Sequence, residues 1–259
     1  MTARSARITA VTSGKGGVGK TFVAANLAAA LARQGERVLV LDADLGLANL
    51  DVVLNLFPKI TLHDVFSGKA RLDDAVLPAP GGFSVLLAGS GMVEYSRMTP
   101  EVREQLQKVI TDVSPRFDQV LLDTGAGISD VVLYTVSLAH DVLVVATPEP
   151  TSLTDAYATI KVLATTQGRR EVRLVANQVR RPGEGRTVRQ QLQQVLDRYV
   201  SPALDSPVRL ELLGEVPSDQ AVRESVIRRR LLLEHLPGTP AAMGIVNIAT
   251  RMLEPGNRS

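Results

Sequence analysis

The chain has 259 residues, of which 45% are hydrophobic and 22% charged, and it contains no cysteine. This composition is that of an ordinary globular protein, and the lack of cysteine excludes disulfide frameworks, thiolate nucleophiles and iron–sulfur clusters. The net charge is +2, with a balance of −3 over residues 1–150 and +5 over residues 151–259. A basic C-terminal part is a feature of surfaces that bind nucleic acid, anionic lipid or acidic partners, although arginines on solvated helices give the same asymmetry.

The apolar segments are too short for a membrane protein. The apolar stretch after the basic residues 1–7 ends at Ser13, which is shorter than the hydrophobic region of a signal peptide. No later run reaches the roughly 18 residues that span a bilayer. We therefore expect a cytoplasmic protein. The low aromatic content of 3% favours an aliphatic core, such as that of a parallel sheet between helices.

Apolar, β-branched runs alternate with helical patterns along the chain. The expected strands are 8–12, 37–41, 83–88, 119–122, 141–146, 172–176 and 208–213. The expected helices are 20–34, 99–113, 129–138, 151–166, 186–199, 218–230 and 242–253, with Thr99 placed to cap the second and Pro100 at its first position. This alternation predicts an α/β fold, a single doubly wound and mostly parallel sheet flanked by helices on both faces.

A phosphate loop lies between the first expected strand and the first expected helix. The pattern of Gly, four residues, Gly, Lys and Thr is formed by Gly14, Lys15, Gly16, Gly17, Val18, Gly19, Lys20 and Thr21. The glycines let backbone N–H groups surround phosphate, Lys20 neutralises its charge, and the Thr21 hydroxyl suits Mg²⁺. The sequence therefore predicts a nucleotide site with magnesium.

Carboxylates and small residues follow other expected strands, at the edge where doubly wound sheets bind their ligands. Asp42 and Asp44 close the second strand, and Asp123 ends the apolar run 120–122, which is the Walker B arrangement. Gly125 follows in a glycine-containing turn that has the character of a switch loop. We expect these residues to meet the phosphate loop.

The nature of the base is indicated by a missing residue. The common guanine-binding motif has four consecutive residues after a strand: Asn or Thr first, Lys second, any residue third and Asp fourth. The corresponding segment here, residues 177–180, begins with Asn177 but ends with Arg180, so it lacks the acid. GTP is therefore disfavoured.

Lys15 is not required by the basic phosphate loop, and with it the loop resembles the deviant loop of the MinD/ParA ATPases. The resemblance implies a P-loop ATPase in which Lys15 reaches across a dimer interface to the phosphates held by the facing subunit. ATP would then complete a homodimer. The alternative is a lysine that pairs with a local carboxylate such as Asp42.

The same resemblance implies catalytic and metal-binding roles. Lys15, Lys20, Asp44 and Asp123 are the implied catalytic residues, with Asp44 positioning the attacking water. Thr21, Asp42 and Asp123 form the implied magnesium site, in which Asp123 holds the water shell and Asp42 also orients the phosphate loop.

Further contacts with the nucleotide are implied for residues outside the phosphate loop. Gly125 would approach the γ-phosphate through its backbone. Asn177, Pro217 and Asp219 would surround the adenine, although a strand-end Asn and a turn of this kind can also be purely structural.

Three longer runs, residues 41–51, 123–130 and 149–163, resemble the FlhG/FleN branch, the bacterial regulators of flagellar number and placement. The resemblance extends over residues 7–236, and we take residues 1–236 as the ATPase domain. It implies two kinds of partner, the flagellar GTPase FlhF and a flagellar transcriptional activator. In some members a helix in an N-terminal extension stimulates FlhF, and here residues 1–7 precede the first expected strand.

Residues 237–259 are expected to form a C-terminal helix and tail. Ile245, Ile248, Ala249 and Met252 recur at helical spacing, with Arg251 as the one basic residue inside the helix. In the resembled family such a helix binds the membrane when ATP drives dimerisation, so contact with an anionic membrane surface is one interpretation. The other is a last helix packed on the core.

Two rival functions share this fold. A MinD- or ParA-type ATPase would position the division site or partition DNA, the latter through a basic surface such as Arg180, Arg181, Arg186, Arg189 and residues 228–230, but DNA is not the expected partner. A metabolic enzyme, for example an ATP-dependent amidase, would instead turn over ATP only with its small-molecule substrate.

Overall fold

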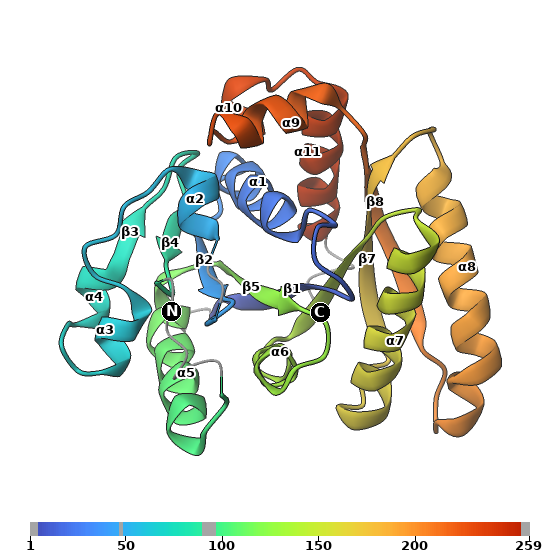
Figure 1. Cartoon of the computed structure of the whole chain (residues 1–259), viewed down its shortest axis with the longest axis horizontal. Coiled ribbons are helices and arrows are strands. Elements are labelled where there is room, and N and C mark those ends of the chain that lie inside the picture. The colour runs from blue at the N-terminus through green and yellow to red at the C-terminus, as the bar shows by residue number, and fades with distance from the viewer. Residues whose placement is uncertain (1–4, 47–48, 90–96, 255–259) are drawn as a thin grey trace.

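The computed structural model describes residues 5–46, 49–89 and 97–254 (Figure 1). The other residues lie outside this description, and they include most of the N-terminal segment, Leu47 and Ala48 of the run 41–51, and the end of the tail. Eight strands of the described part form one sheet in the order β3-β4-β2-β5-β1-β6-β7-β8. Neighbouring strands are parallel except β3 and β4, so the predicted fold class is confirmed.

The expected strands are present, and one more was not expected. The bounds are β1 Arg7–Ser13, β2 Val38–Ala43, β3 Val76–Pro78, β4 Ser84–Leu86, β5 Gln119–Ala126, β6 Asp141–Ala146, β7 Glu171–Val179 and β8 Arg209–Pro217. Strand β3 has three residues and pairs antiparallel with β4 at the edge of the sheet. So short a strand gives no alternation that a sequence pattern could show.

The seven expected helices are also present, within three residues of their expected ends. The helices are α1 Lys20–Arg33, α2 Leu50–Leu54, α3 Leu62–Phe66, α4 Leu72–Ala75, α5 Pro100–Val113, α6 Asp130–Ser137, α7 Pro150–Thr166, α8 Glu184–Tyr199, α9 Gln220–Ile227, α10 Leu232–His235 and α11 Pro240–Met252. Thr99 caps α5 as predicted, since its side chain accepts a hydrogen bond from Val102 N. The short helices α2, α3, α4 and α10 were not predicted, because four or five residues show no helical period.

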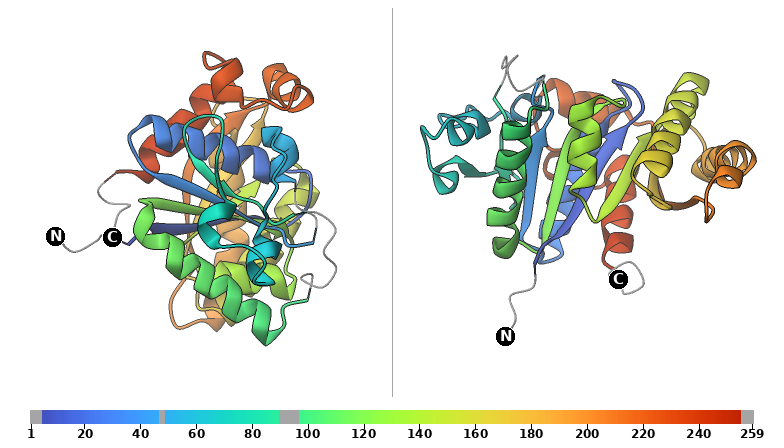
Figure 2. Two further views of the ribbon diagram at one scale, coloured as in Figure 1. Left: turned by 90° about the vertical axis from the view of Figure 1, so that its left-hand side faces the viewer. Right: turned by 90° about the horizontal axis from the view of Figure 1, so that it is seen from below.

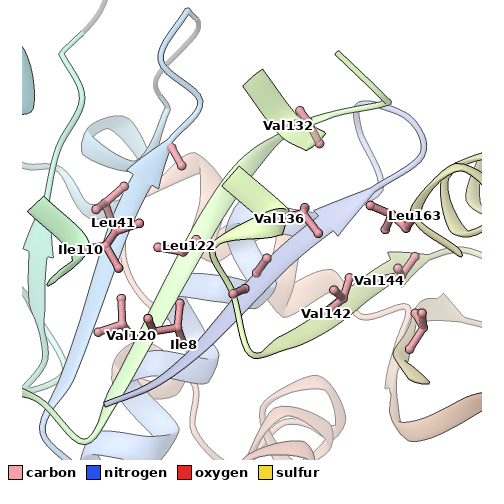
Figure 3. Close-up of a cluster of buried hydrophobic side chains, with 14 of the residues drawn as sticks. Ile8, Leu41, Ile110, Val120, Leu122, Val132, Val136, Val142, Val144 and Leu163 are labelled. Carbon is pink, nitrogen blue, oxygen red and sulfur yellow. The ribbon is translucent and has the colours of Figure 1, made fainter. Parts of the chain in front are cut away.

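Helices cover both faces of the sheet (Figures 1 and 2). The central strands are apolar on both sides: in β2, Val38 and Val40 pack with α1, whereas Leu39 and Leu41 pack with the helices of the opposite face. Helices α1, α2 and α9–α11 bury their side chains on the first face, and α3–α8 bury theirs on the second. Figure 3 shows the second core, where Ile8, Val120, Leu122, Val142 and Val144 of the strands meet Ile110, Val136 and Leu163 of α5, α6 and α7.

Helix α11 is part of the core on the first face, which also contains α1. The apolar residues that the sequence placed on one side of it, Ile245, Ile248, Ala249 and Met252, are at most 3% exposed and pack with side chains of α1 and β8. They cannot contact a lipid surface while they are buried in this way, so the structure agrees with the interpretation of a last helix packed on the core. No helix among the described residues is long and apolar enough to cross a membrane.

Two glycines allow α11 to approach β8 closely. A Cβ on Gly244 of α11 would lie 2.6 Å from the carbonyl oxygen of Glu215, and a Cβ on Gly214 of β8 would lie 2.6 Å from Ile248 Cγ1. Both distances are shorter than real side chains tolerate. Gly244 lowers the intrinsic stability of the helix, because glycine is a poor helix former, but the close packing of α11 on β8 requires it.

We predict that Gly244→Ala lowers the free energy of unfolding by about 1–3 kcal/mol, because its methyl group meets the backbone of β8. In an exposed helix the same change would raise stability by about 1 kcal/mol. Urea denaturation measures the difference. The control is Met243→Ala at the neighbouring, 58% exposed position, where we expect a change within about 0.5 kcal/mol. A Gly244→Ala protein as stable as the parent would contradict this packing.

Candidate nucleotide-binding site

The sequence-predicted residues meet at the carboxyl ends of β1, β2 and β5, in the middle of the sheet. The phosphate loop leaves β1 and leads into α1. Strand β1 lies between β5 and β6, so the chain crosses from one half of the sheet to the other at this position. Such a switch point is where open α/β sheets bind their ligands, because the loops on either side diverge there.

The phosphate loop has the backbone of an anion-binding loop. Gly17 and Gly19 have φ angles of +82° and +87°, in the left-handed region that glycine adopts without strain. Gly16 and Gly17 are exposed, and a Cβ on either would meet nothing within 4 Å, so the space above the loop is open. Val18 points the other way and is buried. The loop and the positive end of α1 therefore suit the phosphates of a nucleotide.

Lys20 is held inside the site by Asp123. The Lys20 Nζ lies 3.0 Å from Asp123 Oδ1, and the two side chains are 10% and 3% exposed. Burial raises the pKa of Asp123, whereas Lys20 and a hydrogen bond with the Thr21 side chain lower it. Thr21 and Asp123 thus bring two oxygen ligands together beside the phosphate loop. Mg²⁺ is commonly bound by one or two protein oxygens together with phosphates, so the pair fits that ion.

Asp42 lies beside Asp123 on the adjacent strand, in register with it. Its Oδ1 accepts from Asp44 N at 3.2 Å and its Oδ2 from Leu50 N at 3.4 Å. The pKa of Asp42 is raised to about 8, first by complete burial and then by the charge of Asp123. Of these two neighbouring carboxyl groups, Asp123 is the one that forms the ion pair with Lys20. Asp42 fixes the turn that carries Asp44.

Asp44 and Gly125 face each other at the ends of β2 and β5. A Cβ on Gly125 would lie 3.5 Å from the carboxyl group of Asp44, so that carboxyl group lies close to the backbone of Gly125. The next glycine, Gly127, has a φ of +86° and donates its N–H to Ser13 O at 2.8 Å, which ties this turn to the end of β1. The structure thus brings Asp44, Gly125 and the phosphate loop together, as the sequence predicted.

Lys15 lies at the surface of the loop and contacts the start of α7. Its Nζ donates to Thr151 Oγ1 at 2.9 Å and lies 3.3 Å from Glu149 Oε2. The local carboxylate is therefore Glu149 rather than Asp42, which is buried with its oxygens on backbone N–H groups. No role was predicted for Glu149 and Thr151. The one signal in the sequence was their place at the start of the run 149–163, which resembles the FlhG/FleN branch.

The residues expected around adenine follow β7 and β8. Asn177 is buried, and its Nδ2 donates to Val18 O at 2.7 Å, so it supports the phosphate loop directly. Pro217 ends β8 in register with Val179, next to Asn177 on β7. Asp219 agrees with the structural alternative: one carboxylate oxygen accepts from Ala221 N at 2.9 Å and the other from Ala241 N at 3.3 Å. Its side chain joins the first turns of α9 and α11, which is a capping role.

This arrangement has known counterparts. The CobQ/CobB/MinD/ParA nucleotide binding domain matches residues 9–232. The antiactivator FleN of Pseudomonas aeruginosa is 42% identical over 246 residues, which cover 95% of this chain and 86% of FleN. The flagellum site-determining protein YlxH of Helicobacter pylori is 32% identical over 242 residues, with 93% and 79% covered. The chain belongs to the MinD/ParA family.

Its sequence is of the FleN/FlhG type, as predicted. A solved member of the family, the septum site-determining protein MinD of Pyrococcus horikoshii with bound Mg-ADP, has a TM-score of 0.75 and 27% identity, covering 96% of both chains. The protein is accordingly an ATPase that uses ATP and Mg²⁺. The expectations of ATPase activity, ATP and magnesium are thus confirmed.

Gly14, the first glycine of the phosphate loop, packs against the backbone of α7, which carries most of the run 149–163. A Cβ on Gly14 would lie 2.2 Å from the carbonyl carbon of Asp155 and 2.5 Å from Ala156 N. The backbone of α7 therefore touches the loop, and Ala156, 1% exposed, is small enough to permit it. The run 149–163 thus positions the loop from one side and contacts Lys15 with its first turn.

We predict that Gly14→Ala lowers the free energy of unfolding of the nucleotide-free protein by about 2–3 kcal/mol, because the new methyl group overlaps backbone atoms of α7. Gly16→Ala is the matched control, since Gly16 has open space and lies outside the left-handed region, and we expect a change within about 0.5 kcal/mol. Denaturation in urea compares the two. Equal stability of both variants would show that α7 does not constrain the loop.

Proposed function

We propose that this ATPase is an ATP-dependent dimerising switch that regulates the number or placement of flagella. The observation that supports the flagellar role is the 42% identity to FleN, an antiactivator, along 95% of the chain, together with the similarity to a flagellum site-determining protein. The observation that supports the switch is the position of Lys15 at the rim of the site.

The two lysines of the phosphate loop differ in how firmly they are held. Lys20 is paired with an interior carboxylate, so it stays in the site of its own chain. Lys15 is 33% exposed and pairs with Glu149, which is 59% exposed. An exposed ion pair of this kind is worth at most about 1 kcal/mol, so Lys15 can leave it at small cost for a phosphate group. We infer that Lys15 binds the nucleotide of a second copy.

The other site residues divide the work of hydrolysis. Lys20, Thr21 and residues 14–19 bind the phosphates, and Thr21 and Asp123 supply protein oxygens to Mg²⁺. Mg²⁺, when bound, neutralises phosphate charge. Asp44, which lies beside Gly125 at the end of β5, aligns the attacking water. Because positioning is the main contribution the protein can make, we expect slow turnover that a partner stimulates.

The proposed partners are a flagellar transcriptional activator and the GTPase FlhF. The similarity to FleN, an antiactivator, favours the activator as partner. Division-site positioning is the second candidate function, supported by the similarity to MinD of P. horikoshii. Peripheral contact with the cell membrane stays within the proposal, but the apolar side of α11 has no part in it because that side is buried.

The flagellar role is tested by counting flagella in the bacterium that carries the gene. We expect cells without the gene to have an altered number or placement of flagella, with the parent gene restoring the normal pattern. Lys20→Ala should fail to restore it because its phosphate-binding lysine is gone, whereas Met243→Ala, which alters an exposed side chain of α11, should restore it. A normal flagellar pattern in the deletion strain, together with misplaced division septa, would favour the second candidate.

A further inference from the structure

A groove of about 350 Å³ lies where the end of α2 meets the turn between α9 and α10. Leu54, Leu56 and Leu231 form its apolar lining, and Arg229 and Arg230 stand at its rim. Helices α9 and α10 run along the outer side of α1, with α2 beside them (Figure 1). None of the nucleotide-site residues lines this groove, so its chemistry serves a different purpose.

Large exposed apolar side chains are close in the chain to residues that line the groove. Phe57, next in the chain to Leu56, is 81% exposed, and Ile227, which ends α9, is 71% exposed. Val226 beside it is 48% exposed. Single exposed apolar residues are common, but several beside an apolar groove with a charged rim are typical of a surface that another molecule covers.

The arginines at the rim have no acidic partner. In the run 228–230, Arg228 pairs with Glu224 at 3.1 Å. Within the described part of the chain, no carboxylate lies within ion-pair distance of Arg229 or Arg230, and both are exposed. Glu234 is an acid of the groove lining, so the rim keeps an excess of positive charge. A ligand that fits this surface carries negative charge beside an apolar group.

Arg229 stands at a position where glycine is favoured. Its φ is +50°, and the hydrogen bonds from Arg229 N to Val226 O and from Arg230 N to Ser225 O form the turn that usually places glycine at this point after a helix. A non-glycine residue is strained there, and strain of this kind is retained where another interaction requires the side chain. For the stability of this turn alone, glycine would be more favourable than arginine at position 229.

We propose that the α2–α9 groove binds an acidic amphipathic segment of a partner protein. An apolar side chain of the segment enters the groove between Leu56 and Leu231, and its carboxylates pair with Arg229 and Arg230. The concave shape favours a protein segment, because a lipid surface is met by projecting side chains rather than by a hollow. The site is independent of the flagellar role proposed above.

The test uses the full chain and a fluorescent helical peptide with leucines on one side and glutamates on the other. We expect saturable binding by fluorescence anisotropy, weakened at least about tenfold in the double variant Arg229→Gly, Arg230→Ser, because two charge-assisted contacts are lost. Its melting temperature should be equal to or above that of the parent, since glycine relieves the strained turn. The control Arg180→Ser, Arg181→Ser removes two exposed arginines of another loop and should bind like the parent.

Several results would overturn the proposal. One is undiminished peptide binding by the double variant, and another is equal binding of a scrambled peptide of the same composition. A third is the absence of peptide binding while sedimentation shows that phosphatidylglycerol vesicles bind the parent and not the double variant, which would assign the surface to lipid. A fourth is concentration-dependent self-association that the same variant abolishes, which would assign it to a second copy of the chain.

Discussion

The buried ion pair between Lys20 and Asp123 is the constraint around which the site is built. A lysine and an aspartate can be stable in the interior only if each satisfies the other, because an unpaired buried charge is costly. The pair therefore requires that the end of β5 and the start of α1 meet at a fixed separation. The apolar strands on both sides of β1 supply that rigidity. Asp42 is buried beside Asp123 on the next strand, and its burial, followed by the charge of Asp123, raises its pKa to about 8.

Around this fixed centre the structure places groups that are held less firmly. Helix α7 touches the phosphate loop through its backbone at Gly14 and contacts Lys15 through Glu149 and Thr151. One helix thus supports the part of the loop that binds the chain's own nucleotide and also holds the lysine that we propose to act on the other subunit. The same loop thus carries Lys20, whose position is fixed by a buried ion pair, and Lys15, whose exposed ion pair leaves it able to change position.

Much of the fold could be predicted from the sequence, because long strands and helices leave a period in the apolar residues. Strand β3 and the short helices α2, α3, α4 and α10 could not, since their positions depend on contacts with distant segments. The phosphate loop and the strand-end acids were found because their chemistry demands particular residues at fixed spacing. The capping of two helices by Asp219 and the pairing of Lys15 with Glu149 could not be predicted, because both depend on contacts between segments that are distant in the sequence. The burial of α11 likewise depends on the contact of Gly214 and Gly244 with neighbouring residues.

The central claim is that the nucleotide site of one chain is completed by Lys15 of another. Mixing two inactive variants tests it most directly. Lys15→Ala keeps Asp44 and Asp44→Ala keeps Lys15, so a mixed dimer contains one site with its own Asp44 and a lysine from the facing subunit. The account predicts that each variant alone hydrolyses little ATP and that the mixture recovers a substantial part of the parent's turnover. Activity in the mixture no greater than the sum of the two separate variants, with mixed dimers shown to form, would contradict it.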